Sequence, residues 1–210
     1  DSLIRAAMPA MLYAKSPADV GRILRAFFAT AAVFYVPLAI ALTLRGDELL
    51  ALLFGSEYGP GGRTALIALS WALLALVGLS VMTTALLVTN HSPDVAAVAF
   101  VTMVLKLGIV WPLVDRWGAL GAGIAVAIAF TAQASLLFWR LSTHGSRPHM
   151  GAALIPAVVG AAGMAPILMT GLPLIPALIG GGLVFLLLWA GMARWLDPAS
   201  LQRLRALLRR

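Results

Sequence analysis

The sequence has no cysteine, only three histidines and few charged side chains. Without cysteine there is no disulfide framework, no iron–sulfur cluster and no thiol nucleophile, and three isolated histidines leave little material for a metal site. The chain also has no Walker loop, no dinucleotide fingerprint and no nucleophile elbow. These absences predict a protein that is not an enzyme and that holds neither a cofactor nor a metal.

Charged residues make up 11% of the chain and apolar residues 61%, whereas soluble globular proteins have about 25% charged and about 45–50% apolar residues. A water-facing surface cannot be built from this composition, so the sequence predicts a membrane protein. Fifteen basic and eight acidic side chains give a net charge of +7. The basic residues lie between apolar blocks and not along one face, which indicates anionic membrane lipids as partners and argues against a nucleic acid.

Six apolar runs are long enough to cross a bilayer, since about 20 residues of helix span a hydrocarbon core about 30 Å thick. A β-barrel is excluded because its strands would alternate polar and apolar residues, and these runs are apolar on nearly every side. We therefore expect an all-α, polytopic membrane bundle of six transmembrane helices, over the ranges Ala26–Leu44, Thr64–Val88, Val95–Val114, Ala119–Trp139, Gly151–Thr170 and Leu174–Trp195.

The distribution of Lys and Arg between alternate connections predicts the orientation, because cytoplasmic loops carry the excess. Eleven basic residues fall on one side and three on the other, while Lys106 lies inside the third run. Both termini are therefore expected in the cytoplasm. The larger group is Arg5, Lys15, Arg22, Arg25, Arg140, Arg147, Arg194, Arg203, Arg205, Arg209 and Arg210, and the smaller group is Arg45, Arg63 and Arg116.

Two segments flank the expected lobe at residues 26–195. In the cytoplasmic lead-in, residues 1–25, Ser16 is an N-cap and Pro17 occupies the first helical position, so a helix should begin here and run into the first span. Residues 196–210 form a basic amphipathic tail, which either lies on the anionic inner leaflet or is a solvated, partly frayed end. The chain starts at Asp1 without an initiator Met, so we expect an upstream half to be missing.

Lys106 is the strongest candidate for a substrate-binding residue. A lysine near the bilayer centre costs about 2.5–3.5 kcal/mol even on the lenient insertion scale, and such residues mark substrate pathways. The side chain leans toward its helix N-terminus, away from the nearer interface, so a water-filled cavity between helices should receive it. Thr102 lies one turn earlier and is expected to line that cavity. The alternative is a structural lysine, bonded to carbonyl groups freed near Pro112 or paired with an acid in the missing half.

Other polar residues in the spans give weaker signals. Gln133 is a further candidate for substrate contact, although a buried amide in a membrane is as often a bond between helices. One polar patch shares a face of the second span, and bonds to its own helix backbone are the favoured interpretation there. That patch consists of Ser80, Thr83 and Thr84.

The polar residues of the predicted loops are expected to have no chemical role. The histidines have no acidic cluster beside them and should be solvated in cytoplasmic loops; they are His91, His144 and His149. The acids of the first outer loop have the chemistry to bind a cation, but they are surrounded by Gly and Pro and are expected instead to cap and turn the chain. Those acids are Asp47, Glu48 and Glu57.

Three short motifs occur in a characteristic order. The segment Leu52-Leu53-Phe54-Gly55-Ser56-Glu57-Tyr58 lies between two spans, Pro9 and Leu12 precede a charged stretch through Arg22 and Arg25, and Trp117–Ala125 is a glycine-rich turn into a span. These motifs resemble, respectively, the LFG-x-EY element, the segment entering the preceding helix and the yG-x-x-GAaiA turn of polysaccharide (O-antigen/oligosaccharide) flippases. These flippases belong to the multidrug/oligosaccharidyl-lipid/polysaccharide exporter superfamily.

The resemblance covers essentially the whole chain and implies the C-terminal half of such a flippase, one of two helical lobes. It implies movement of polyprenyl-pyrophosphate-linked oligosaccharide across the bacterial inner membrane by alternating access, with the missing N-terminal lobe as partner. The family often has a polar residue such as Asn at the place of Lys106, so the resemblance assigns no role to the lysine. A cation there suits an anionic pyrophosphate.

Several other functions remain open from the sequence. A peptidoglycan-precursor (lipid II) flippase and a multidrug antiporter are the nearest alternatives. A membrane-embedded glycosyltransferase or ligase would need a long outer loop with catalytic side chains, and no such loop is evident. A purely structural membrane subunit would give Lys106 no cavity to face.

Overall fold

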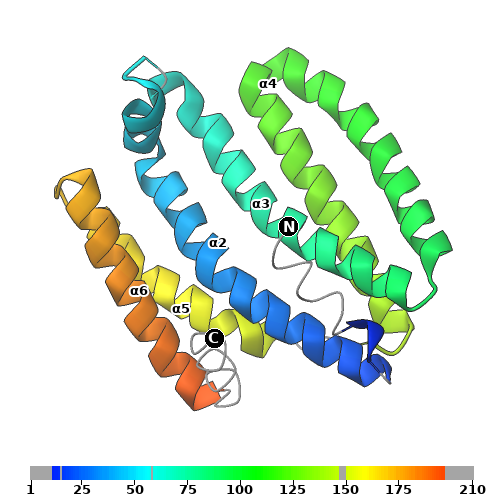
Figure 1. Ribbon diagram of the computed structural model, residues 1–210. Coiled ribbons are helices and arrows are strands. Elements are labelled where there is room, and N and C mark those ends of the chain that lie inside the picture. Colours follow the sequence, from blue (N-terminus) through cyan, green and yellow to red (C-terminus); the bar gives the residue numbers. More distant parts are fainter. Residues whose placement is uncertain (1–10, 15, 58, 147–149, 197–210) are drawn as a thin grey trace.

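A computed structural model describes residues 11–14, 16–57, 59–146 and 150–196. In this part of the chain the protein is all-helical, and the major elements are five helices (Figure 1). The predicted helical class is confirmed, whereas the expected number of six separate helices is not found. The helices are α2 (Pro17–Phe54), α3 (Gly59–Val88), α4 (Ser92–Thr143), α5 (Met150–Leu168) and α6 (Leu174–Leu196).

Helix α2 begins where the sequence predicts. The Ser16 side chain accepts a hydrogen bond from the Asp19 amide at 3.2 Å, and Pro17 lies in the first turn, where its missing N–H costs nothing. The helix continues past the predicted end at Leu44 and stops at Phe54, because Gly55 adopts a φ of 105°, which L side chains rarely adopt.

Much of the predicted first outer loop is therefore helical. Asp47 and Glu48 lie inside α2, so the expectation that they cap and turn the chain is wrong, while Glu57 does lie in the turn after the helix. The helix is interrupted at Arg45, whose φ of −127° and ψ of 25° are not helical. Glu48 pairs with Arg45 at this kink, which keeps both charges on one turn.

Helix α4 contains both the third and the fourth predicted spans. Its 52 residues are interrupted at Gly118, where φ is 54° and ψ is −129°. The chain reverses there, and Figure 1 shows two antiparallel arms that we call the first arm (92–117) and the second arm (119–143). A Cβ atom at Gly121 would lie 1.8 Å from the carbonyl oxygen of Leu113, so the reversal needs a glycine at this point too.

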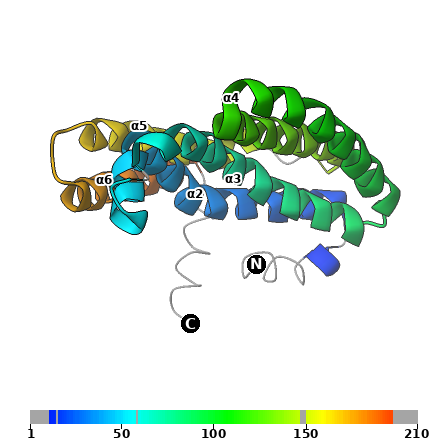
Figure 2. The same cartoon turned by 90° about the horizontal axis from the view of Figure 1, so that it is seen from above.

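Helix α2 lies at the centre of the bundle. Figures 1 and 2 show α3 and α4 on one side of it and α5 and α6 on the other. Two buried apolar clusters form the core: one joins the first half of α2 to α3 and α4 around Leu24, Leu86 and Leu137, and the other joins α2 to α5 and α6 around Ala157 and Phe185. The packing thus divides into two groups of helices that share α2.

The helices are compatible with a membrane. Among the described residues, α2, α3, α4 and α6 contain segments long and apolar enough to cross a bilayer, and α5 is a shorter apolar helix. The turn after α2, the reversal at Gly118 and the α5–α6 turn lie at one end of the bundle, and the α3–α4 turn and the end of α6 lie at the other (Figure 1). Basic residues therefore gather by end, with Arg22, Arg25, Arg140 and Arg194 opposite Arg45, Arg63 and Arg116. The side that faces the cytoplasm stays a prediction.

Candidate functional site

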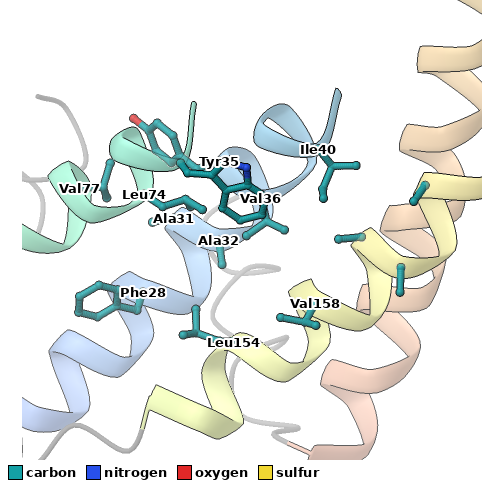
Figure 3. Close-up of a pocket in the computed structure, with 14 residues that line it drawn as sticks. Phe28, Ala31, Ala32, Tyr35, Val36, Ile40, Leu74, Val77, Leu154 and Val158 are labelled. Carbon is teal, nitrogen blue, oxygen red and sulfur yellow. The ribbon is translucent and has the colours of Figure 1, made fainter. Parts of the chain in front are cut away.

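An apolar groove of about 490 Å³ lies between α3 and α5, with α2 beneath it (Figure 3). We call it the α2–α3–α5 groove. Figure 3 shows Phe28 and Ile40 of α2, Leu74 and Val77 of α3, and Val158 of α5 around this space. Its complete lining is Phe28, Ala31, Ala32, Tyr35, Val36, Ile40, Trp71, Leu74, Val77, Leu154, Val158, Ala161, Ala162 and Ala165.

Small side chains leave the space that forms this groove. Alanines occupy the positions where α2 and α5 face each other, including Ala32 and Ala161, which are almost fully buried. No charged side chain lines the groove, and its side-chain polar groups are the phenol of Tyr35 and the indole N–H of Trp71. Such a hollow favours an apolar ligand with few polar contacts.

The groove lies within the membrane spans predicted from the sequence. Each lining residue falls inside one of three predicted spans, Ala26–Leu44, Thr64–Val88 or Gly151–Thr170. Val158 is 61% exposed and Trp71 is 45% exposed, so the groove opens to the surroundings of the protein. In a bilayer those surroundings are hydrocarbon, and a chain-like lipid could enter sideways.

Lys106 lies elsewhere, on the first arm of α4. It is half-buried, and its ammonium nitrogen is 5.8 Å from the centre of the Phe130 ring on the second arm. This is a cation–π distance. Helix α4 contributes no residue to the α2–α3–α5 groove, so the cavity described here is not the cationic one expected from the sequence. The substrate role of Lys106 stays a prediction.

Thr102 and Gln133 also lie outside the groove. The Thr102 hydroxyl is buried and donates to the carbonyl oxygens of Val98 at 2.8 Å and Ala99 at 3.1 Å, as expected for a threonine that satisfies its own helix. Gln133 is half-buried on the second arm, one turn from Phe130. The structure thus places Thr102 one turn from Lys106 but brings neither it nor Gln133 to the groove.

The polar patch on α3 behaves as a structural feature. Ser80 donates to the carbonyl oxygen of Leu76 at 3.0 Å, and Thr84 donates to that of Ser80 at 2.9 Å. Both hydroxyls are therefore satisfied within the helix, which agrees with the favoured interpretation from the sequence.

A group of titratable side chains lies at the open end of the α4 hairpin. We call His91, Asp94, Arg140 and His144 the histidine cluster. Nε2 of His144 is 2.7 Å from Oδ2 of Asp94, and a guanidinium nitrogen of Arg140 is 3.4 Å from Oδ1. The His91 and His144 rings lie 3.7 Å apart between centroids. The expectation that these two histidines have no acid beside them is therefore wrong, while His149 lies outside the described residues.

The electrostatics of this cluster favour an ionised Asp94. Asp94 precedes the apolar run that begins at Val95, so it lies outside the predicted spans. The hydrogen bond from His144 lowers the pKa of Asp94, and the nearby charge of Arg140 lowers it further, against an opposing effect of partial burial. Within the described residues, no group of three potential ligands could hold a metal ion.

Arg45 forms a second polar contact between distant segments, at the opposite end of the bundle. Its guanidinium donates to the carbonyl oxygens of Leu168 at 3.2 Å, Thr170 at 3.3 Å and Leu172 at 3.1 Å. These carbonyls belong to the end of α5 and the turn into α6. The kink in α2 therefore positions an arginine that caps the C-terminus of another helix.

Only partial signals for these sites are present in the sequence. The groove could have been sought where alanine pairs recur in two spans, at Ala31 and Ala32 and again at Ala161 and Ala162. Asp94 lies three residues after His91, which is a local sign of a polar cluster, but the arrival of His144 depends on the reversal at Gly118.

Comparison with known proteins adds no family or function, because no family profile, curated protein or solved structure matches the chain.

Proposed function

We propose that this chain is the C-terminal lobe of a flippase that moves polyprenyl-pyrophosphate-linked oligosaccharide across the bacterial inner membrane for polysaccharide biosynthesis. The observation that carries the proposal is the α2–α3–α5 groove. A cargo with a long isoprenoid chain needs an apolar recess at membrane depth, and a groove of this size falls within the range of about 300–1,000 Å³ that is typical of ligand sites.

In this proposal the helices form six crossings, with the two arms of α4 counted separately. The start of α2 and the end of α6 then lie at the same end of the bundle, where Arg22, Arg25, Arg140 and Arg194 outnumber the basic residues Arg45, Arg63 and Arg116 of the other end. That end is the cytoplasmic one under the positive-inside rule. In the proposed protein a second lobe precedes this one, and rocking of the two lobes exposes the cargo site to each side in turn.

Lys106 has a separate part in this proposal. Because it belongs to α4, which does not line the groove, it is assigned instead to the anionic pyrophosphate during passage. Its ammonium lies near the Phe130 ring, beside exposed apolar residues of the first arm such as Leu107. An anion is the partner that would offset the cost of a charge at this depth.

The groove variant Ala162→Phe tests the proposal. Ala162 lines the groove and is exposed, so a larger side chain fills the hollow without entering the buried core. The full-length protein carrying this change, reconstituted in liposomes, is expected to lose most of its flipping of polyprenyl-pyrophosphate oligosaccharide. The matched control is Ala99→Phe on the exposed first arm of α4, which should retain flipping. Equal activity of the two variants would contradict the proposal.

The same assay separates the alternatives. A lipid II flippase would move the peptidoglycan precursor and not the oligosaccharide carrier, and a multidrug antiporter would move apolar cations in exchange for an ion. A glycosyltransferase or ligase would release a new glycoside without moving the carrier.

A further inference from the structure

The histidine cluster ties together the open end of the α4 hairpin. Asp94 lies in the first turn of α4, and His144 follows its last residue, so their 2.7 Å contact joins positions fifty residues apart. The two arms are connected covalently through Gly118 at the other end. The cluster therefore joins the two arms non-covalently, at the end opposite their covalent connection at Gly118.

When two imidazole rings are in contact, protonation of one ring disfavours protonation of the other. The His91 and His144 ring centroids are 3.7 Å apart with planes 39° apart, and Nδ1 of His91 lies 3.1 Å from the hydroxyl of Thr89. A proton on His144 is stabilised by the Asp94 carboxylate, with which it forms a charge-assisted hydrogen bond. A second proton on His91 would face the cations of His144 and Arg140, and like charges at this distance oppose it.

We propose that the histidine cluster is a site for a single proton, and that binding this proton tightens the connection between the two arms of α4. Before this proton binds, His144 already contacts the ionised Asp94 carboxylate. Protonation places a positive charge beside that carboxylate, so the contact becomes an ion pair. Histidine is the side chain whose charge ordinarily changes between about pH 5 and 8.

The charges around the cluster are consistent with one bound proton. The charged or titratable groups that act on Asp94 are His144, Arg140 and His91. Helix α2 also meets this end, since a Cβ atom at Gly145 would lie 3.8 Å from Pro17. The charged residues of its first turns, Asp19 and Arg22, pair with each other.

The absence of cysteine allows a direct test with spin labels. Ser92→Cys and Thr143→Cys place labels at exposed positions beside the cluster, one on each arm. In nanodiscs, the distance distribution between the labels should be narrower at about pH 6 than at about pH 8. His144→Gln should abolish this narrowing, and the control His149→Gln, which leaves the four cluster side chains intact, should keep it.

Two results would overturn the proposal: a distribution that does not change with pH in the unaltered cluster, or an equal change in the His144→Gln protein. Circular dichroism checks that the variant is folded, and Asp94→Asn provides a second variant with the same expected loss.

A measurement without any cluster substitution uses ¹⁵N-labelled histidine, with His149→Gln to assign the third signal. At about pH 6 one ring of the pair should be protonated and the other neutral. Two protonated rings, or none, would refute the single-proton site.

Discussion

The guanidinium of Arg45 donates a hydrogen bond to the carbonyl oxygen of Leu168, 123 residues further along the chain, at 3.2 Å. The same side chain also reaches the carbonyls of Thr170 and Leu172, and only 12% of it is exposed. The kink in α2 and the end of α5 are therefore held by one residue. This contact unites the central helix with the α5–α6 pair.

Replacement of Arg45 should loosen that end of the bundle. Arg45→Met removes the donors to three carbonyls, and the part-buried carbonyl of Leu168 is then left without compensation for its desolvation. We expect the apparent Tm in detergent to fall by several degrees. Arg45→Lys should recover only part of the loss because an ammonium lacks the planar fork of the guanidinium. The control Arg63→Met breaks an exposed 3.9 Å pair with Asp47 and should change Tm little. Equal effects at both arginines would contradict this role.

The hairpin of α4 should tolerate a side chain at Gly108 but not at Gly121. A Cβ atom at Gly121 would collide with the Leu113 carbonyl, whereas a Cβ atom at Gly108 meets nothing within 4 Å. Gly121→Ala is expected to destabilise the protein by about 1–3 kcal/mol through overpacking. Gly108→Ala should be neutral or slightly stabilising, because alanine favours helix. Thermal unfolding of the two single variants measures the difference, and the reverse order would disprove the tight reversal.

Lys106→Met should fold and insert but impair transport. The cation–π contact with Phe130 is worth only about 0.5–1 kcal/mol at an accessible site. Loss of a charge inside the bilayer favours insertion. If Lys106 meets the pyrophosphate, the variant loses flipping of the anionic carrier, and Lys106→Arg keeps part of it. Normal flipping by a well-inserted Lys106→Met protein would leave the lysine with a structural role only.

Acid should weaken the contact made by Asp94. Its pKa is lowered mainly by the hydrogen bond from His144, so its ionised form is favoured in the folded state. A carboxyl group whose pKa is lower in the folded than in the unfolded state stabilises the fold fully at pH values above its unfolded-state pKa of about 3.9. This stabilisation is lost as the pH falls through the folded-state pKa. The Tm difference between wild type and Asp94→Asn should therefore still be present at about pH 5 and shrink below about pH 4. A difference that stays constant into strong acid would contradict the assigned cause.

Local signals predicted much of the fold. Ser16 and Pro17 marked the start of α2, and the apolar runs located α3, α5 and α6 to within a few residues. The end of α2 at Phe54 was missed because the apolar run stops at Leu44, next to the kink at Arg45, whereas helix resumes beyond the kink and includes charged residues such as Asp47. Arg45 and Glu48 pair one turn apart, and this pairing stabilises the helical turn that follows the kink.

The candidate sites depended on contacts between distant segments. Lys106 stood out by its own chemistry, but its neighbour Phe130 is supplied by the reversal at Gly118. The groove has no unusual residue at all, since it arises where alanines of α2 and α5 leave space beside α3. Such a hollow is a property of packing, and hydropathy along the chain does not encode it.

The most direct test of the transport proposal is to find where the lipid chain binds. A polyprenyl pyrophosphate with a photoreactive group on its isoprenoid chain can be cross-linked to the protein in nanodiscs, and the labelled peptides identified by mass spectrometry. We expect labelling to concentrate on the groove segments 28–40, 71–77 and 154–165 and to fall sharply in Ala162→Phe. Uniform labelling of the exposed apolar surface, including the first arm of α4, with no effect of Ala162→Phe would contradict the proposed function.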